Sequence, residues 1–241
     1  MKKLILTTAA FAFAAGAALA DGHSVVRLGT EGAYAPWNFL DDNGEVAGFE
    51  REVGDELCAR AELTCEWVTN EWDSIIPNLV SGNYDVIIAG MSITAERDEV
   101  IDFSDPYTQP DPSAFVAMSD MDMSSAVIAA QSGTIQASHI ASMDGATLVE
   151  FATPEETIAA VKNGEADAVL ADKAFLEPIA EAEPDLSIVG EDVLLGGGIG
   201  LGIRESDGEL REKFNAAIQS MKDDGTLNKL IEKHLPGSAL F

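Results

Sequence analysis

A small set of polar side chains has the types needed to hold a molecule that carries both a carboxylate and an ammonium group. Arg97 offers a guanidinium fork, and Ser92 and Thr134 offer donors, which together can bind a carboxylate. Asp172 can accept hydrogen bonds from an ammonium group. This combination suits the zwitterion of an α-amino acid.

Aromatic and acidic residues close to these positions could contact the side chain of such a ligand. Tyr34 and Trp72 can sandwich an aliphatic stem or a cationic end group. Glu31 would then be free to face a positive side chain, so that Glu31 and Asp172 would meet two cationic groups. The inventory therefore favours arginine, lysine, ornithine or histidine as the ligand.

Each of these residues, taken alone, also has a purely structural interpretation. Tyr34 and Trp72 could belong to a core, and Arg97 stands in an acidic stretch that is typical of an exposed helix start. Asp172 could cap a helix that begins after it. Only the combination of residues points to a binding site.

The elements that would position these residues alternate between strands and helices, the pattern of an α/β protein with parallel strands covered by helices. We expect strands at 25–28, 65–69 and 85–89, and helices at 50–61 and 74–80. Ligands of open α/β sheets bind beyond the carboxyl ends of the strands. The residues that follow such ends are Glu31, Tyr34, Trp72, Gly90 and Ser92, then Thr134, Gln136 and Asp172, with Arg97 just past Ser92.

A weak internal repeat predicts two lobes. Residues 79–90 and 161–172 each read as a helix end, a glycine stop, an aspartate and an apolar strand. The first strand and its Gly29-Thr30 loop are likewise echoed by 127–130 and Gly133-Thr134. The alternative is that this order of helix end, glycine, aspartate and apolar strand recurs by chance in α/β proteins.

Two segments suit crossovers between the lobes. Segment 103–112 contains three prolines, which cannot continue a helix or a central strand, and segment 195–200 is rich in glycine. We expect the helical stretch 210–234 to return and pack on the first lobe. The expected boundaries are 21–108 with 195–241 for lobe 1, and 109–194 for lobe 2.

The first twenty residues have the features of a cleavable secretory leader. Lys2 and Lys3 precede the apolar run 4–19, and Ala18-Leu19-Ala20 forms a small-x-small cleavage site, which places the mature start near Asp21. A membrane helix is the alternative, but the run is short for one. Because no cysteine stands at the cleavage site for lipid attachment, we expect a free periplasmic protein.

The net charge disfavours several classes of binding partner, and the cysteine content bears on disulfides and metal sites. A formal charge of −28 argues against a nucleic-acid partner and disfavours anionic membranes. The negative charge could concentrate cationic ligands, although solubility in salty water explains the charge equally well.

In an oxidising compartment Cys58 and Cys65 form a disulfide by default. His23, His139 and His234 do not stand at zinc-ligand spacing from the cysteines.

Motifs for catalysis and cofactor binding are missing from the expected places. The glycine-rich segment 196–200 is not followed by a P-loop lysine, and the loop after the first strand lacks GxGxxG. No G-x-S-x-G elbow stands at a strand-to-helix turn. We therefore expect a binding protein without catalytic residues, metal or cofactor.

The chain resembles the bacterial family 3 solute-binding proteins over essentially its whole mature length. The resemblance lies in segments 29–39, 48–50, 72–79 and 91–97, the last leading into 101–107. It is strongest to the branch that binds lysine/arginine/ornithine, histidine and opines, which shares Cys58-x6-Cys65 as a disulfide. The resemblance implies a type II periplasmic binding protein fold, in which two lobes are joined by two crossover strands.

The resemblance also implies roles for residues and partners. The implied roles are α-carboxylate binding by Arg97 with Ser92 and Thr134, α-amino binding by Asp172, pocket lining by Gly90 and Gln136, stacking by Tyr34 and Trp72, and contact with a basic side chain by Glu31. The implied partner is an inner-membrane ABC permease, and lobe closure captures the ligand. We expect a monomer.

Three departures from the family pattern leave the ligand open, the first being a start of the second lobe, at 118–125, that is shorter than usual. Arg51 stands where the family prefers an apolar residue. Ala89-Gly90 replaces paired serines, which removes side-chain donors and should widen the pocket. Alternatives are a binder of glutamine, glutamate or another polar amino acid, and a cyclohexadienyl or arogenate dehydratase on the same fold. A receptor sensor domain is disfavoured because neither a membrane helix nor a signalling domain precedes Phe241.

Overall fold

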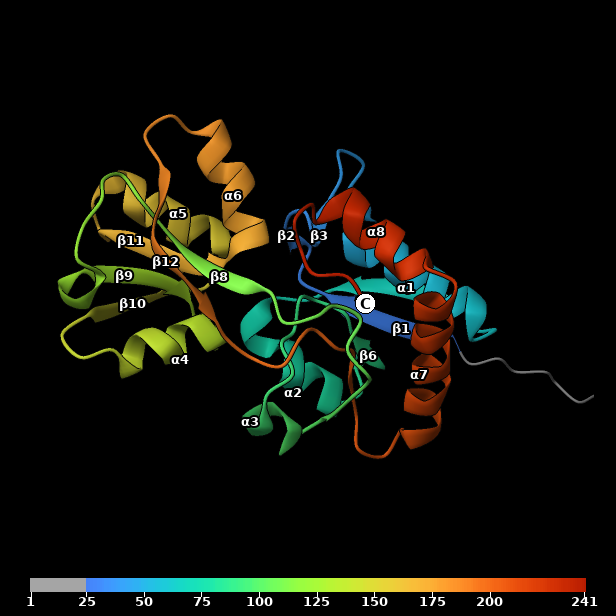
Figure 1. Cartoon of the computed structure of the whole chain (residues 1–241). Coiled ribbons are helices and arrows are strands. Elements are labelled where there is room, and N and C mark those ends of the chain that lie inside the picture. Colours follow the sequence, from blue (N-terminus) through green and yellow to red (C-terminus); the bar gives the residue numbers. More distant parts are fainter. Residues whose placement is uncertain (1–24) are drawn as a thin grey trace, which may run out of the picture.

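The computed structural model describes residues 25–241, which form two α/β lobes joined by extended segments (Figure 1). The expected leader, residues 1–20, lies outside the described residues, as does His23. The prediction of a two-lobed α/β protein is confirmed. Within 25–241 no helix has the length and apolar character that crossing a membrane requires.

The first lobe is built on a five-stranded sheet of order β5-β1-β6-β13-β7, with a small sheet β2-β3-β4 beside it. Its strands are β1 (Val26–Thr30), β2 (Ala33–Tyr34), β3 (Asn38–Leu40), β4 (Val46–Ala47), β5 (Cys65–Thr69), β6 (Val86–Ile87), β7 (Asp102–Phe103) and β13 (Gly202–Ile203). Its helices are α1 (Phe49–Arg60), the 3-10 turn η1 (Trp72–Ser74), α2 (Ile75–Val80), α3 (Ala95–Asp98), α7 (Gly208–Asp223) and α8 (Thr226–His234).

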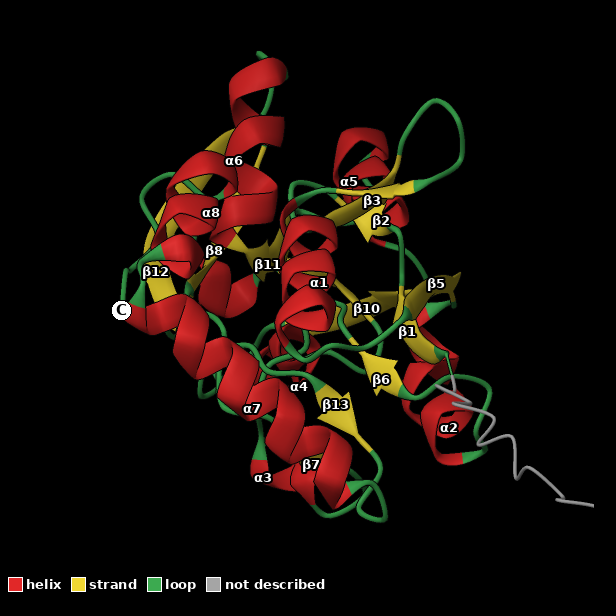
Figure 2. Cartoon of the chain, turned by 90° about the vertical axis from the view of Figure 1, so that its right-hand side faces the viewer, coloured by secondary structure: helices red, strands yellow, loops and turns green. Residues whose placement is uncertain are grey.

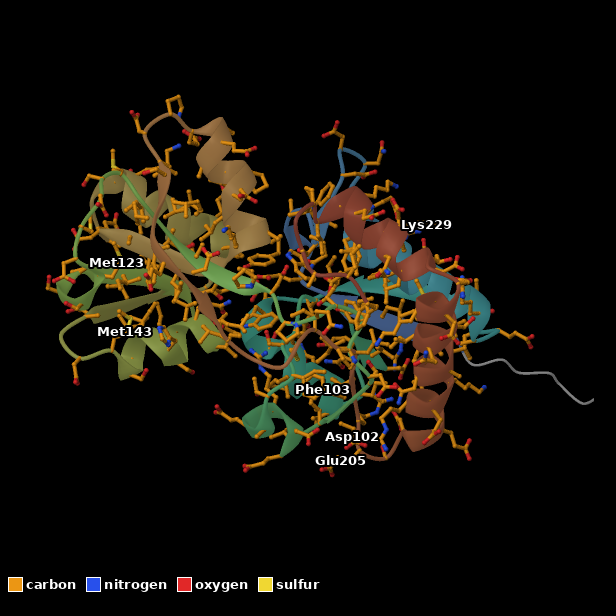
Figure 3. All side chains as sticks on the ribbon, in the orientation of Figure 1. Asp102, Phe103, Met123, Met143, Glu205 and Lys229 are labelled. Atoms are coloured by element: carbon orange, nitrogen blue, oxygen red, sulfur yellow. A yellow bond between two sulfur atoms is a disulfide. The ribbon has the colours of Figure 1, made fainter. Side chains whose placement is uncertain are left out.

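The second lobe contains a five-stranded sheet of order β10-β9-β11-β8-β12. Its strands are β8 (Pro112–Ala117), β9 (Val127–Gln131), β10 (Thr147–Phe151), β11 (Ala168–Asp172) and β12 (Ser187–Leu194). Its helices are the 3-10 turn η2 (Met123–Ser125), α4 (Ile135–Ser142), α5 (Pro154–Asn163) and α6 (Lys173–Ala182). The apolar core of this lobe includes Ile128, Ile140 and Leu170, and the partly buried Met123 and Met143 pack against it (Figure 3).

Both main sheets are mixed rather than mostly parallel. β1 runs parallel to β5 and β6, and β9 runs parallel to β10 and β11, as the βα repeat predicts. The remaining pairings, made by β13 in the first lobe and β8 in the second, are antiparallel. The chain enters β8 and β13 directly from the crossover segments. These strands are therefore not reached through the helical connection that usually joins two parallel strands.

The two predicted crossover segments run side by side between the lobes. The backbone N–H of Tyr107 donates to the carbonyl oxygen of Ile199 at 2.8 Å, and Thr108 and Ile199 form an isolated antiparallel bridge. The segments therefore form a paired connection that a relative motion of the lobes would have to bend.

The C-terminal stretch forms two helices that pack against α1 (Figure 2). We expected one helical stretch over 210–234, and the break between α7 and α8 falls at Gly225, whose φ of 74° is left-handed. Glycine adopts this conformation without steric cost, so the chain turns there. Cys58 at the end of α1 and Cys65 at the start of β5 form the predicted disulfide.

Candidate ligand-binding site

All nine residues proposed from the sequence surround one pocket between the lobes. The space free of protein atoms at this pocket amounts to about 350 Å³ when the part open to solvent is counted. Its lining is Glu31, Tyr34, Trp72, Ala89, Gly90, Ser92, Arg97, Gln131, Thr134, Ile135, Gln136 and Asp172. Gln131 and Ile135 are lining residues that the sequence did not indicate, and Ala89 was indicated only as part of the Ala89-Gly90 pair.

Tyr34 reaches across the boundary between the lobes. Its hydroxyl donates to Oδ2 of Asp172 at 2.9 Å and accepts from the backbone N–H of Asp172 at 3.1 Å. Its ring stacks on Phe175 of α6, with centroids 4.2 Å apart. Contacts with the second lobe therefore contribute to the burial of Tyr34.

Arg97 points into the boundary between the lobes rather than to bulk solvent. Its guanidinium donates to the carbonyl oxygen of Ser92 at 2.9 Å and to that of Gly133, in the other lobe, at 3.2 Å. The guanidinium carbon lies 5.3 Å from the centroid of the Trp72 ring, within range of a cation–π contact. Burial lowers the pKa of Arg97 to about 10, although the charge of Asp172 opposes the shift.

The hydroxyl of Thr134 is already used within the protein. It accepts from the backbone N–H of Ala137 and donates to the carbonyl oxygen of Gln131 at 2.7 Å, so it caps α4. The donors left at this end of the pocket are the first-turn N–H groups of α4, which have no partner inside the helix. Of the backbone N–H and hydroxyl donors that the sequence left open at Thr134, the N–H groups of the helix N-terminus are therefore the ones that face the pocket.

Asp172 does not cap the helix that follows it. Its side chain makes no cap bond to α6 and instead accepts from Tyr34 and from Nε2 of Gln136 at 3.0 Å. The same Gln136 amide donates to the hydroxyl of Ser113 at 3.0 Å, which fixes its orientation. Burial raises the pKa of Asp172 to about 6, against the lowering effect of the Tyr34 hydrogen bond.

Glu31 meets Gln131 across the pocket. Nε2 of Gln131 donates to Oε1 of Glu31 at 2.6 Å and to the carbonyl oxygen of Ala152 at 3.0 Å. Burial raises the pKa of Glu31 to about 7, with the Gln131 hydrogen bond opposing it. The strand-end rule could have found Gln131, because it is the last residue of β9.

Gly90 forms part of the pocket wall with a backbone that favours glycine. Its φ is 60°, in the left-handed region that side chains disfavour, and its N–H donates to Oε1 of Glu50 at 2.6 Å.

Among the described residues, no group of three or more His, Cys, Asp or Glu side chains is arranged to hold a metal ion.

Comparison with known proteins identifies the family. A family description, bacterial extracellular solute-binding proteins, family 3, matches residues 26–237. The histidine-binding periplasmic protein of Escherichia coli strain K12 is 32% identical, with 97% of each chain covered. The octopine-binding periplasmic protein of Rhizobium meliloti is 31% identical, again with 97% of each chain covered.

Solved structures show the same architecture. A periplasmic binding protein of the His/Glu/Gln/Arg/opine family from Silicibacter pomeroyi, in complex with lysine, superimposes with a TM-score of 0.88. It is 67% identical and covers 90% of this chain and 100% of its own. An ancestral arginine-binding protein bound to arginine has a TM-score of 0.81 and 32% identity, covering 88% of this chain and 98% of its own. The prediction of a solute-binding protein rather than an enzyme is confirmed by these relatives, so a dehydratase is no longer proposed.

Proposed function

Since the chain belongs to the bacterial extracellular solute-binding proteins, family 3, we propose that it captures a free amino acid with a basic side chain. The proposal places this capture in the periplasm, after removal of the leader, and makes an inner-membrane ABC permease the receiving partner. Relatives named as periplasmic binding proteins and as an ABC transporter arginine-binding protein support both parts.

The charge balance of the pocket is the observation that carries the proposal. Two acidic side chains, Glu31 and Asp172, and one basic side chain, Arg97, line it. When all three are ionised they sum to one negative charge, which a neutral zwitterion leaves unbalanced. Unpaired buried charge is costly, so a ligand with one additional positive charge is favoured.

The proposed pose follows from the donors and acceptors. The ligand carboxylate meets the Arg97 guanidinium and the first-turn N–H groups of α4, and the ammonium meets Asp172. The side chain passes between Tyr34 and Trp72 toward Glu31. There Gln131 adds an acceptor, because both of its amide hydrogens are already donated and its carbonyl oxygen remains.

Capture by lobe closure is supported by direct contacts between the lobes. Besides the Tyr34–Asp172 and Glu31–Gln131 pairs, the hydroxyl of Ser132 donates to Oδ1 of Asp73 at 2.6 Å. These contacts join residues that are 59 to 138 positions apart in the sequence. A ligand held between the same surfaces would add its own bonds to this closed arrangement.

Glutamine is a second candidate ligand. An ancestral arginine-binding protein with 32% identity to this chain has been solved bound to glutamine. The pKa of Glu31, raised to about 7 by burial, allows a protonated carboxyl that could donate to an amide oxygen. A neutral polar side chain would then satisfy the pocket without a second positive charge.

Calorimetric titration with lysine, arginine, ornithine, histidine, glutamine and glutamate tests the proposal. The protein is first unfolded and refolded to remove any ligand that co-purifies. We expect at least one basic amino acid to bind more tightly than glutamine and glutamate. Binding of glutamine or glutamate alone would overturn the basic-ligand proposal and leave the family membership untouched.

A further inference from the structure

A buried carboxylate outside the pocket connects the pocket with the crossover segments. Glu50, near the start of α1, is 0% exposed. Its Oε1 accepts from the N–H of Gly90 at 2.6 Å and from the hydroxyl of Tyr107, and its Oε2 accepts from Nδ2 of Asn38 at 2.7 Å. Three neutral donors therefore hold the carboxylate, and none of these partners is a basic residue.

The Asn38 contact leads to the loop that carries two pocket residues. Oδ1 of Asn38 accepts from the N–H of Gly32 at 2.7 Å, and Asn38 is 0% exposed. Gly32 lies between Glu31 and Tyr34 in the chain. The position of this loop thus depends on Asn38, whose orientation is set by Glu50.

The Tyr107 contact leads to the crossovers. Tyr107 belongs to the first crossover segment, is 0% exposed, and is bonded through its N–H to Ile199 in the second crossover segment. The third contact, to Gly90, reaches the pocket wall directly. One carboxylate thus touches the paired connection and supports two parts of the pocket.

We propose that Glu50 is a positioning residue that couples the crossovers to the shape of the pocket. The carboxylate binds its three donors together only in one relative arrangement of Tyr107, Gly90 and Asn38. A ligand that contacts the Gly32 loop and the Gly90 turn stabilises that arrangement and, through Glu50, one conformation of the crossovers. This inference rests on the proposed function, because it concerns binding of the same amino-acid ligand.

Tyrosine-to-phenylalanine variants separate coupling from stability. Tyr107→Phe removes the crossover partner of Glu50 and keeps the buried ring. Tyr84→Phe is the matched control, because Tyr84 is also 0% exposed and its hydroxyl donates to the carbonyl oxygen of Ile75 within the first lobe. A residue with a merely structural role would lower the melting temperature and leave the dissociation constant unchanged.

We expect Tyr107→Phe to raise the dissociation constant for lysine roughly tenfold, as loss of a charge-assisted hydrogen bond coupled to binding predicts. Tyr84→Phe should leave that constant within about twofold of wild type, while both variants lower the melting temperature of the ligand-free protein. Equal dissociation constants for Tyr107→Phe and wild type would overturn the coupling.

A residue swap provides an independent test. In Glu50→Gln an amide N–H faces the Nδ2 donor of Asn38, which cannot turn over without losing its bond to Gly32. Adding Asn38→Asp restores complementarity, because the carboxylate introduced at position 38 accepts both from the new amide at position 50 and from the N–H of Gly32. We expect Glu50→Gln to weaken lysine binding about tenfold or more and the double variant to recover most of that loss.

The order of measurement keeps the two proposals distinguishable. Wild-type protein is titrated first with the amino-acid panel, and the tightest ligand replaces lysine if it is another one. If no panel member binds, the proposed function fails, and this inference fails with it. If wild type binds and the Tyr107 and Tyr84 variants bind alike, only the proposed coupling through Glu50 is wrong, and the proposed function stands.

Discussion

Tyr34 and Asp172 lie in different lobes and are joined twice, because the tyrosine hydroxyl donates to the carboxylate at 2.9 Å and accepts from the aspartate N–H at 3.1 Å. The hydroxyl therefore holds the side chain that is proposed to bind the ligand ammonium. It does so only while the lobes are closed.

Removing that hydroxyl should weaken ligand binding. Tyr34→Phe keeps the ring that stacks on Phe175 but leaves Asp172 without one of its donors. A hydrogen bond to a charged group contributes about 1.5–3 kcal/mol, so we expect affinity to fall roughly 10- to 100-fold. Calorimetry measures the loss, and stopped-flow fluorescence should assign it mainly to faster dissociation. Unchanged affinity would show that Asp172 needs no support from Tyr34.

The guanidinium of Arg97 should be irreplaceable by an ammonium. Arg97→Lys keeps the positive charge but loses the planar fork and its simultaneous contacts with Ser92 and Gly133. We expect the dissociation constant to rise about 100-fold or more, with the fold retained by circular dichroism. Arg51→Lys, which alters an exposed ion pair with Asp55, is the control and should bind like wild type. Equal effects of the two substitutions would contradict the carboxylate assignment.

The stability of the ligand-free protein should depend on Glu31 near neutral pH. Burial raises the pKa of Glu31 to about 7 and that of Asp172 to about 6, so the folded protein holds protons that the unfolded chain has released. The stability contributed by these groups is fully present below the unfolded pKa values of about 4 and is lost progressively as the pH rises to the folded values of about 6 and about 7. The melting temperature of wild type should therefore fall between about pH 4 and about pH 7, and that of Glu31→Gln should fall less.

Ligand binding should show the opposite pH dependence through the same carboxyl. A cationic side chain favours ionised Glu31 and lowers its pKa, so lysine affinity should decrease as the pH falls below about 7. Calorimetry in buffers of different ionisation enthalpy should detect released protons in wild type and fewer in Glu31→Gln. Proton release that is identical in both proteins would rule out Glu31 as the titrating group.

The disulfide should stabilise the fold without affecting the site. Cys65 begins β5, whereas the pocket lies beyond the carboxyl ends of strands such as β1 and β9. Closing a loop with a sequence separation of 7 contributes about 2–3 kcal/mol in the chain-entropy account. The double substitution Cys58→Ser, Cys65→Ser should lower the free energy of unfolding by about that amount in urea titrations. Its dissociation constant should match wild type, and a large change would indicate that this end of α1 reaches the pocket.

Local patterns predicted the elements that carry the site. The strand expected at 65–69 matches β5, and the helix expected at 50–61 differs from α1 by one residue at each end. The nine proposed site residues line one pocket because strand ends of both lobes converge there. The alternation of strands with helices and the glycines that end helices are patterns of neighbouring residues, so they can be recognised in a single sequence.

Long-range contacts could not be predicted in the same way. The acidic context of Arg97 suggested a surface residue, and its direction depends on the Gly133 carbonyl, which is supplied by the other lobe. The Glu50–Tyr107 contact joins residues 57 positions apart, and nothing in the local pattern of either residue indicates it. The local pattern around Thr134 did not indicate which of its donors is free, and the hydroxyl is used by the cap of α4.

The positive charge on the ligand side chain is the central claim, and paired titrations of charged and uncharged analogues test it most directly. Lysine is compared with N6-acetyllysine, and arginine with citrulline, in the same buffer. We predict that the tighter-binding basic amino acid loses at least about 100-fold in affinity when its charge is removed, since ionised Glu31 then meets only the neutral Gln131 amide and no positive charge. Equal affinity for a charged ligand and its uncharged analogue would contradict the account.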